Sequence, residues 1–213
     1  SSLHDWMFSM NSGTLHLMIV NYLAHFYLAY PEPDLMFGNY IGDGVRGSNF
    51  KDFSDAVARG IRFHRFIDTY TDAHEEVLKA KKLFYPSQSK FSGVVVDVMF
   101  DHILAKSWNE FSEHDLNDFA QECYKVIEEN RSALPFRSER FYQYMSGQNI
   151  LPKYATEEGI TQVFRGMDSR TKYASNMLTS MNDSRSFRLE LSGHFKRFFP
   201  NLVDVCEEWK SEN

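Results

Sequence analysis

The sequence predicts an all-α protein, folded as a single-domain helical bundle, and three observations support this. Apolar residues recur at intervals of three and four once the chain is divided at its glycines and prolines, and no predicted strands alternate with helices. Only 11 Gly and 6 Pro occur in 213 residues, too few for a turn-dense β-sandwich. Aromatic residues make up 15% of the chain, so a large core can be buried and disorder is excluded.

The expected helices follow from caps, breakers and apolar periodicity. Ser54 is a predicted N-cap, Thr71 and Asp72 form a second one, and Pro86 is expected to end a helix. The valines at 94–96 leave a buried strand as the alternative there, but the length of the periodic segment favours a helix. The expected helices span residues 21–30, 34–40, 54–69, 73–84, 92–111, 115–130, 139–145, 157–167, 173–181 and 186–199.

The composition limits the classes of partner and the compartment. The net charge is -6, which excludes nucleic-acid binding by bulk charge. The two cysteines, Cys123 and Cys206, have neither the number nor the spacing for a disulfide framework or a zinc site. We therefore expect a protein of the reducing cytoplasm.

The first residues carry no expected function. Residues 1–17 are polar and Ser-rich, and Met18 resembles a natural start, so we expect 1–17 to be an extension and 18–213 a single helical domain. No Lys or Arg precedes Arg46, so we expect neither a secretory signal nor a transit peptide. The apolar stretch at 15–30 contains two histidines and is too short to span a bilayer, so no membrane association is expected.

Two predicted helices each carry a pair of ionisable residues four positions apart. His64 and Asp68 would project from one helix face, where an imidazole and a carboxylate can share a divalent cation; a simple hydrogen bond on a wet surface is the alternative. Asp97 and Asp101 have the same spacing on a very apolar helix. Burying both requires a metal ion or basic partners, unless one of them faces solvent.

A glycine-rich loop supplies a third candidate. Asp43 lies between Gly42 and Gly44, where the backbone can bend closely around a ligand, and Arg46 carries a guanidinium suited to phosphate. An ordinary Asp–Gly turn beside a solvent-exposed arginine is the alternative. His25 is a fourth candidate, although a lone histidine in an aromatic helix is commonly a core residue. Taken together, these residues indicate metal-assisted hydrolysis of a phosphate ester.

Several short motifs also occur in a specific order. They are Asn21-Tyr22-Leu23-Ala24-His25, Gly38-Asn39 with Gly42-Asp43 and Val45-Arg46-Gly47, His64-Arg65-Phe66-Ile67-Asp68 with Thr71-Asp72, Asp97-Val98-Met99-Phe100-Asp101-His102, Gly166-Met167-Asp168-Ser169-Arg170 and Phe198-Phe199-Pro200. In this order and spacing they resemble the acyl carrier protein phosphodiesterase family. The resemblance covers roughly residues 21–202.

The resemblance implies a fold, a reaction and a set of site residues. The fold would be distantly similar to that of the HD-domain metal phosphohydrolases. Family members use Mn²⁺ or Mg²⁺ to remove 4'-phosphopantetheine from the serine of holo acyl carrier protein, which is then the implied partner. The implied metal ligands are Asp43, His64, Asp68 and Asp101. The implied catalytic or acid–base groups are Asp43, His64, Arg65, Asp97, His102 and His25, and the implied phosphate or substrate contacts are Arg46, Arg65, Arg170 and Arg62.

Acyl carrier protein is acidic, so a partner with a net charge of -6 needs a local basic face. Six basic residues on two consecutive helices could form it, or could be an ordinary solvated surface: Arg59, Arg62, Arg65, Lys79, Lys81 and Lys82. Two other functions stay open at this point. One is HD-like hydrolysis of a small nucleotide or phosphate ester, and the other is a non-catalytic helical binding module whose histidines and aspartates form a structural network.

Overall fold

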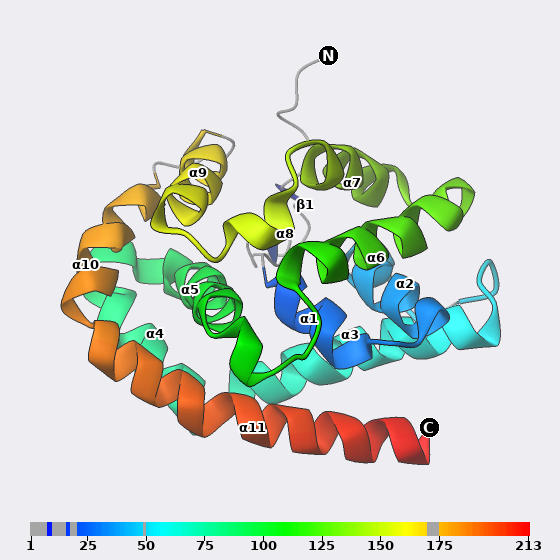
Figure 1. The fold of residues 1–213 in the computed structure, drawn as a ribbon, viewed down its shortest axis with the longest axis horizontal. Coiled ribbons are helices and arrows are strands. Elements are labelled where there is room, and N and C mark those ends of the chain that lie inside the picture. The colour runs from blue at the N-terminus through cyan, green and yellow to red at the C-terminus, as the bar shows by residue number, and fades with distance from the viewer. Residues whose placement is uncertain (1–7, 10–15, 18–20, 49, 170–174) are drawn as a thin grey trace.

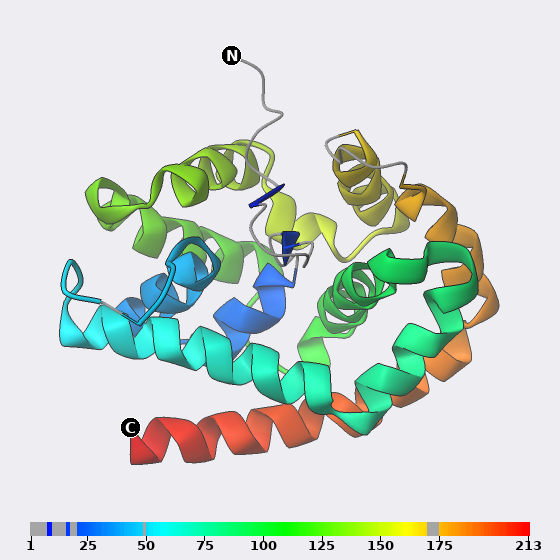
Figure 2. The ribbon, with the colours of Figure 1, turned by 180° about the vertical axis from the view of Figure 1, so that it is seen from behind.

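The structure, a computed structural model, describes residues 8–9, 16–17, 21–48, 50–169 and 175–213. These residues form an all-α fold, as the sequence predicts (Figures 1 and 2). Two two-residue strands, β1 (Phe8–Ser9) and β2 (His16–Leu17), pair antiparallel within the segment expected to be an extension. Among the described residues, none of the helices has both the length and the apolar character needed to cross a membrane.

Eleven α-helices follow one another along the described residues, joined by short 3₁₀ turns. They are α1 (Tyr22–Ala29), α2 (Pro33–Ile41), α3 (Asp55–Ala73), α4 (Glu75–Gln88), α5 (Ser92–Lys106), α6 (Leu116–Glu129), α7 (Phe136–Gly147), α8 (Ile150–Lys153), α9 (Glu157–Asp168), α10 (Ser180–Ser186) and α11 (Arg188–Glu212). The 3₁₀ turns are η2 (Gly42–Gly44), η3 (Ser89–Phe91), η4 (Trp108–Glu110), η5 (Arg131–Ala133) and η6 (Met177–Thr179).

Helix α11 closes one long side of the molecule (Figure 1). Its middle turns bury Phe195 and Phe199, which stack with ring centroids 4.9 Å apart and contact Phe111 edge-on. Near its end, Trp209 lies against Phe63 of α3, with the two ring centroids 4.9 Å apart. The aromatic content of the sequence is thus used to fasten the last helix onto the earlier ones.

Helices α2 and α3 cross with their backbones in contact. A Cβ atom added to Gly60 of α3 would lie only 2.6 Å from the carbonyl oxygen of Leu35 and 2.7 Å from Cα of Gly38. Real Cβ contacts are longer, so both helices need glycine at the crossing. This contact places the residue after Gly38 directly beside α3.

Helix α1 is held against α5 by a buried carboxylate. Asn21, the N-cap residue of α1, makes no side-chain capping bond. Instead, Asp101 of α5, which is fully buried, accepts hydrogen bonds from the backbone amides of Leu23 (2.9 Å) and Ala24 (3.0 Å). A residue 77 positions away in sequence from Ala24 therefore caps the helix.

Most expected helices are confirmed, with corrections at their ends. Ser54 caps α3 as predicted, and residues 94–96 are helical. The second cap is His74 and not Thr71 or Asp72, because α3 continues to Ala73 and the His74 side chain accepts from the amide of Glu76. Proline also ends fewer helices than expected: α4 continues to Gln88 and α11 to Glu212, because tertiary packing outweighs the single backbone bond that a proline removes.

The four-residue helix α8 was not expected, and the segment expected at 173–181 lies partly outside the described residues. Cys123 and Cys206 are both buried and free, so they do not pair with each other.

Replacement of Gly60 by alanine tests the helix crossing. We expect Gly60→Ala to lower the free energy of unfolding by about 1–3 kcal/mol, the usual cost of overpacking. Gly147→Ala is the matched control, because a Cβ there meets no heavy atom within 4 Å. Urea unfolding measures both, and equal stability of the two variants would contradict the crossing described here.

Candidate functional site

Two histidines and two aspartates from three elements meet in one cluster. Nε2 of His64 on α3 lies 3.1 Å from Oδ1 of Asp43 in η2 and 3.1 Å from Oδ2 of Asp68, one turn further along α3. Nε2 of His25 on α1 lies 3.3 Å from the other oxygen of Asp68. The two imidazole rings stack, with centroids 4.5 Å apart. Two nitrogens and two carboxylates therefore face one small volume.

Asn39 of α2 orients both imidazole rings. Its side chain is fully buried, and its Oδ1 lies 2.7 Å from Nδ1 of His25 and 3.2 Å from Nδ1 of His64. Its Nδ2 donates to the backbone carbonyl of His25 at 2.8 Å, so Oδ1 is the acceptor for both rings. Both histidines must then carry a proton on Nδ1, which directs both Nε2 atoms toward the aspartates.

The electrostatics of the cluster couple His64 to its carboxylates. Burial lowers the pKa of His64, but the charges of Asp68 and Asp43 more than offset this and raise it from 6.5 to about 10. Burial raises the pKa of Asp68, yet His64 and His25 bring it well below its usual range. Without a cation, the site therefore holds a proton between His64 and its carboxylates at neutral pH.

Glycine and arginine shape the loop that carries Asp43. A Cβ at Gly42 would overlap the His64 side chain, so glycine there admits the ring. Arg65, half-buried on α3, donates to the carbonyl of Val45 at 2.9 Å, and its guanidinium carbon lies 5.2 Å from the ring centre of Phe50. Arg65 therefore holds the loop in place beside His64.

Asp97 of α5 is coupled electrostatically to the carboxylates of the cluster. Burial raises the pKa of Asp97 to about 8; Lys81 opposes this rise, and the carboxylates of Asp68, Asp72 and Asp43 add to it. Asp97 consequently keeps its proton at neutral pH, unlike Asp68.

The buried hydroxyl of Tyr22 on α1 also lies near the cluster. The pKa of Tyr22 is raised well above its usual value by burial first, with Asp43 and Asp68 contributing. This hydroxyl has no hydrogen-bond partner among the described residues, and neither does the buried hydroxyl of Thr71 on α3.

The structure brings together four of the predicted site residues and separates others. His25, Asp43, His64 and Asp68 form the cluster. Asp101, implied as a metal ligand, uses both oxygens to cap α1. His102 turns to another face of α5, where Nδ1 donates to the carbonyl of Tyr154 at 2.6 Å, and burial lowers its pKa.

The predicted arginines lie in different settings. Arg46 is exposed beyond the loop, and Arg62 is exposed on α3 with its guanidinium 5.9 Å from the ring centre of Phe50. Arg170 lies outside the described residues.

Asn39 was not assigned a role from the sequence. Its signal was available, because an amide in an otherwise apolar helix, directly after a glycine, must find buried partners. What no pattern shows is that both partners are imidazoles on two other helices.

The donor set fits a divalent cation. His25, His64 and Asp68 form a group whose potential ligand atoms all lie within 4.8 Å of one another, and Asp43 adjoins His64. Nε2 of His25 is buried and has no partner in hydrogen-bond geometry among the described residues. Neutral imidazole and carboxylate are both common ligands of first-row metals, and the Asn39 contacts are the supporting bonds that such ligands usually have.

Comparison with known proteins identifies relatives over most of the chain. The family model for acyl carrier protein phosphodiesterase matches residues 20–202. The acyl carrier protein phosphodiesterase of Klebsiella pneumoniae strain 342 is 31% identical over 189 residues, which cover 88% of this chain and 98% of that protein. The enzyme of the same name from Photorhabdus laumondii is 29% identical over 88% of this chain and 96% of its own length. No solved structure matches.

The raised pKa of His64 predicts how stability depends on pH in the cation-free protein. The folded state binds the proton more tightly than the unfolded state, so this contribution is complete below pH 6.5 and is lost as the pH rises toward 10. With EDTA present, we expect the free energy of unfolding to fall less between pH 7 and pH 10 in His64→Gln than in the wild type. His114→Gln, at an exposed position, serves as the control and should follow the wild type. Parallel curves for wild type and His64→Gln in urea unfolding would refute the coupling.

Proposed function

Because this chain belongs to the acyl carrier protein phosphodiesterase family, we propose that it hydrolyses the phosphodiester linking 4'-phosphopantetheine to the serine of holo acyl carrier protein. The products would be apo acyl carrier protein and 4'-phosphopantetheine. The observation that carries this proposal is the cluster of His25, Asp43, His64 and Asp68, which lies within the matched residues.

We infer that Nε2 of His25 and His64 and the carboxylates of Asp43 and Asp68 hold a divalent cation, Mn²⁺ or Mg²⁺. The two imidazoles favour Mn²⁺, since Mg²⁺ prefers oxygen ligands. When bound, such a cation supplies charge stabilisation for a phosphodiester and a nucleophile at neutral pH. The proton held by His64 in the cation-free site must leave when the cation binds, because a ligating imidazole is neutral.

The chain's own residues have separate tasks in this proposal. Asn39 keeps both Nε2 atoms directed at the site. Asp97 keeps a proton at neutral pH and is our candidate to donate it to the departing serine oxygen. Arg65 supports the loop with Asp43, and Arg46, the exposed arginine of that loop, is our candidate to contact phosphate. The similarity to HD-domain phosphohydrolases remains part of the proposal.

Much of the basic face expected to contact acyl carrier protein is engaged within the chain. Arg59 pairs with Glu32 at 2.8 Å and Lys81 with Asp72 at 2.7 Å. Lys79 pairs with both Glu75 and Glu76. Arg62 on α3 and Lys82 on α4 are exposed and form no ion pair with a described residue. We propose these two as the docking cations for the acidic protein, in the cytoplasm.

The reaction is tested by intact-mass spectrometry of holo acyl carrier protein incubated with the protein and Mn²⁺. We expect loss of the phosphopantetheine group, abolished by EDTA. Asn39→Ala should lower the rate about 10- to 100-fold, as losing a bond that orients a metal ligand usually does, and Asp43→Ala and His64→Ala should lower it further. His114→Gln is the control.

The negative results separate the alternatives. Stoichiometric Mn²⁺ without cleavage would reject this substrate and direct the search to small phosphodiesters or nucleotides. Absence of both cleavage and bound metal would reject the hydrolase and favour a binding module with a structural polar network.

The docking cations make a separate prediction. Arg62→Glu and Lys82→Glu should raise KM for holo acyl carrier protein and leave hydrolysis of a small diester unchanged, because only the protein substrate reaches that surface. Lys125→Glu, an exposed position on α6, should leave both unchanged. An equal loss on protein and small substrates would exclude a docking role.

A further inference from the structure

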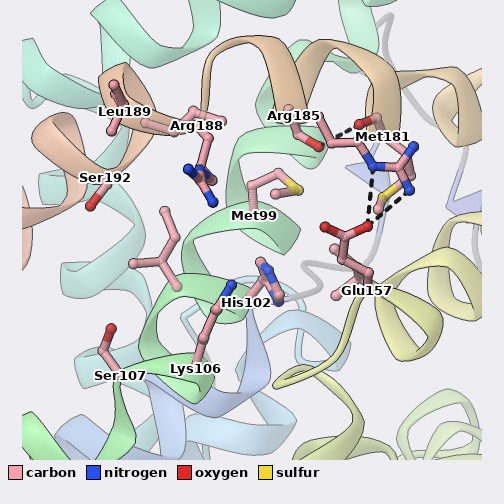
Figure 3. Close-up of a pocket in the computed structure, with 14 residues that line it drawn as sticks. Met99, His102, Lys106, Ser107, Glu157, Met181, Arg185, Arg188, Leu189 and Ser192 are labelled. Atoms are coloured by element: carbon pink, nitrogen blue, oxygen red, sulfur yellow. Dashed lines mark hydrogen bonds and ion pairs between the residues drawn. The ribbon is translucent and has the colours of Figure 1, made fainter.

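A cavity lies on the far face of α5 from the histidine–aspartate cluster. It has a volume of about 390 Å³ and is bounded by α5, α9, α10 and α11 (Figure 3). Met99, Ile103 and Lys106 line it, and these α5 positions point away from those of Asp97 and Asp101. The cavity is large enough for a small ligand and is not used by the proposed phosphodiesterase site.

The floor of the cavity is apolar and buried. Met99 of α5, Ile160 of α9, Met181 of α10 and Leu191 of α11 each expose 6% or less of their surface. His102 also lines it, and because Nδ1 donates to Tyr154, Nε2 is the ring nitrogen left for a ligand. Such a floor accepts an apolar body with a single polar contact.

The mouth of the cavity is basic in an acidic protein. Arg185 is paired with Glu157, at 2.8 and 3.1 Å, so these two charges cancel. Lys106 and Arg188 are exposed, point into the cavity from α5 and α11 (Figure 3), and form no ion pair within the part of the chain that the structure describes. Two positive charges thus lie above an apolar floor without an ion-pair partner among the described residues, and the carboxylate of Glu157, already paired with Arg185, interacts with Lys106 only at longer range.

We propose that this cavity binds an organic phosphate monoester with an apolar body. A phosphate monoester carries nearly two negative charges at neutral pH, which matches Lys106 and Arg188, and a guanidinium can bind two phosphate oxygens at once. The apolar body would lie on Met99 and Met181. Neither the cluster nor a divalent cation takes part in this binding.

Octyl phosphate is the probe for this site, titrated in the presence of EDTA so that the cluster holds no cation. Calorimetry gives the affinity, and methyl NMR of the methionines gives the position. We expect the signals of Met99 and Met181 to shift and that of Met145, buried on α7, to stay unchanged. Octanol, octanoate and inorganic phosphate should each bind at least about tenfold more weakly. Octanol and octanoate lack the phosphate group, and inorganic phosphate lacks the apolar body.

Charge-removing variants complete the test. The double variant Lys106→Gln/Arg188→Gln should bind octyl phosphate at least about tenfold more weakly, and Lys196→Gln, exposed on α11, should bind it like the wild type. These positions are exposed, so folding should not change. The proposal is overturned if octanol or octanoate binds as tightly as octyl phosphate, if the double variant binds like the wild type, or if Met99 and Met181 do not respond. Since binding is the readout, the result does not depend on whether the protein cleaves holo acyl carrier protein.

Discussion

Helices α2 and α3 meet with their backbones in contact at Gly38 and Gly60, and the arrangement of the site depends on that contact. With side chains at the crossing, the helices would separate, and Asn39 would no longer reach His64. Glycine generally destabilises a helix interior, so the two glycines at this crossing lower the stability of each helix but allow the two backbones to come into contact. The hydrogen bonds of the site therefore depend on the close backbone packing of these two helices.

The acidic groups of the site are accommodated in the interior in different ways. Asp68 and Asp43 face the protonated His64. Asp101 accepts hydrogen bonds from two backbone amides, which lower its pKa, but burial outweighs them and raises that pKa well above its usual value. Asp97 forms no ion pair with a described residue and stays neutral, which also avoids a buried charge. Three outcomes thus occur among acidic residues on neighbouring helices: ion pairing, helix capping and protonation.

The sequence predicted the fold class and most helices, because periodicity and caps are local signals. The pairing of His64 with Asp68 was predictable for the same reason, since it lies within one helix turn. Asp97 and Asp101 have the same four-residue spacing, but Asp101 caps α1 instead of pairing within its own helix. Only the packing of α5 on α1 decides this. Likewise, the continuation of α11 through Pro200 to Glu212 depends on contacts with other helices, which local patterns do not contain.

The shared acceptor at Asn39 has a consequence for how such a site can change over evolutionary time. Both lone pairs of its oxygen are used, one for each imidazole, so one residue sets the orientation of two histidines that lie 39 positions apart in the chain. Because both rings contact the same oxygen, a substitution at position 39 changes the environment of both histidines at once. The orientation of the two imidazoles is thus inherited or lost as a unit, and a gradual change in the arrangement of the cluster must begin elsewhere, in the loop that carries Asp43.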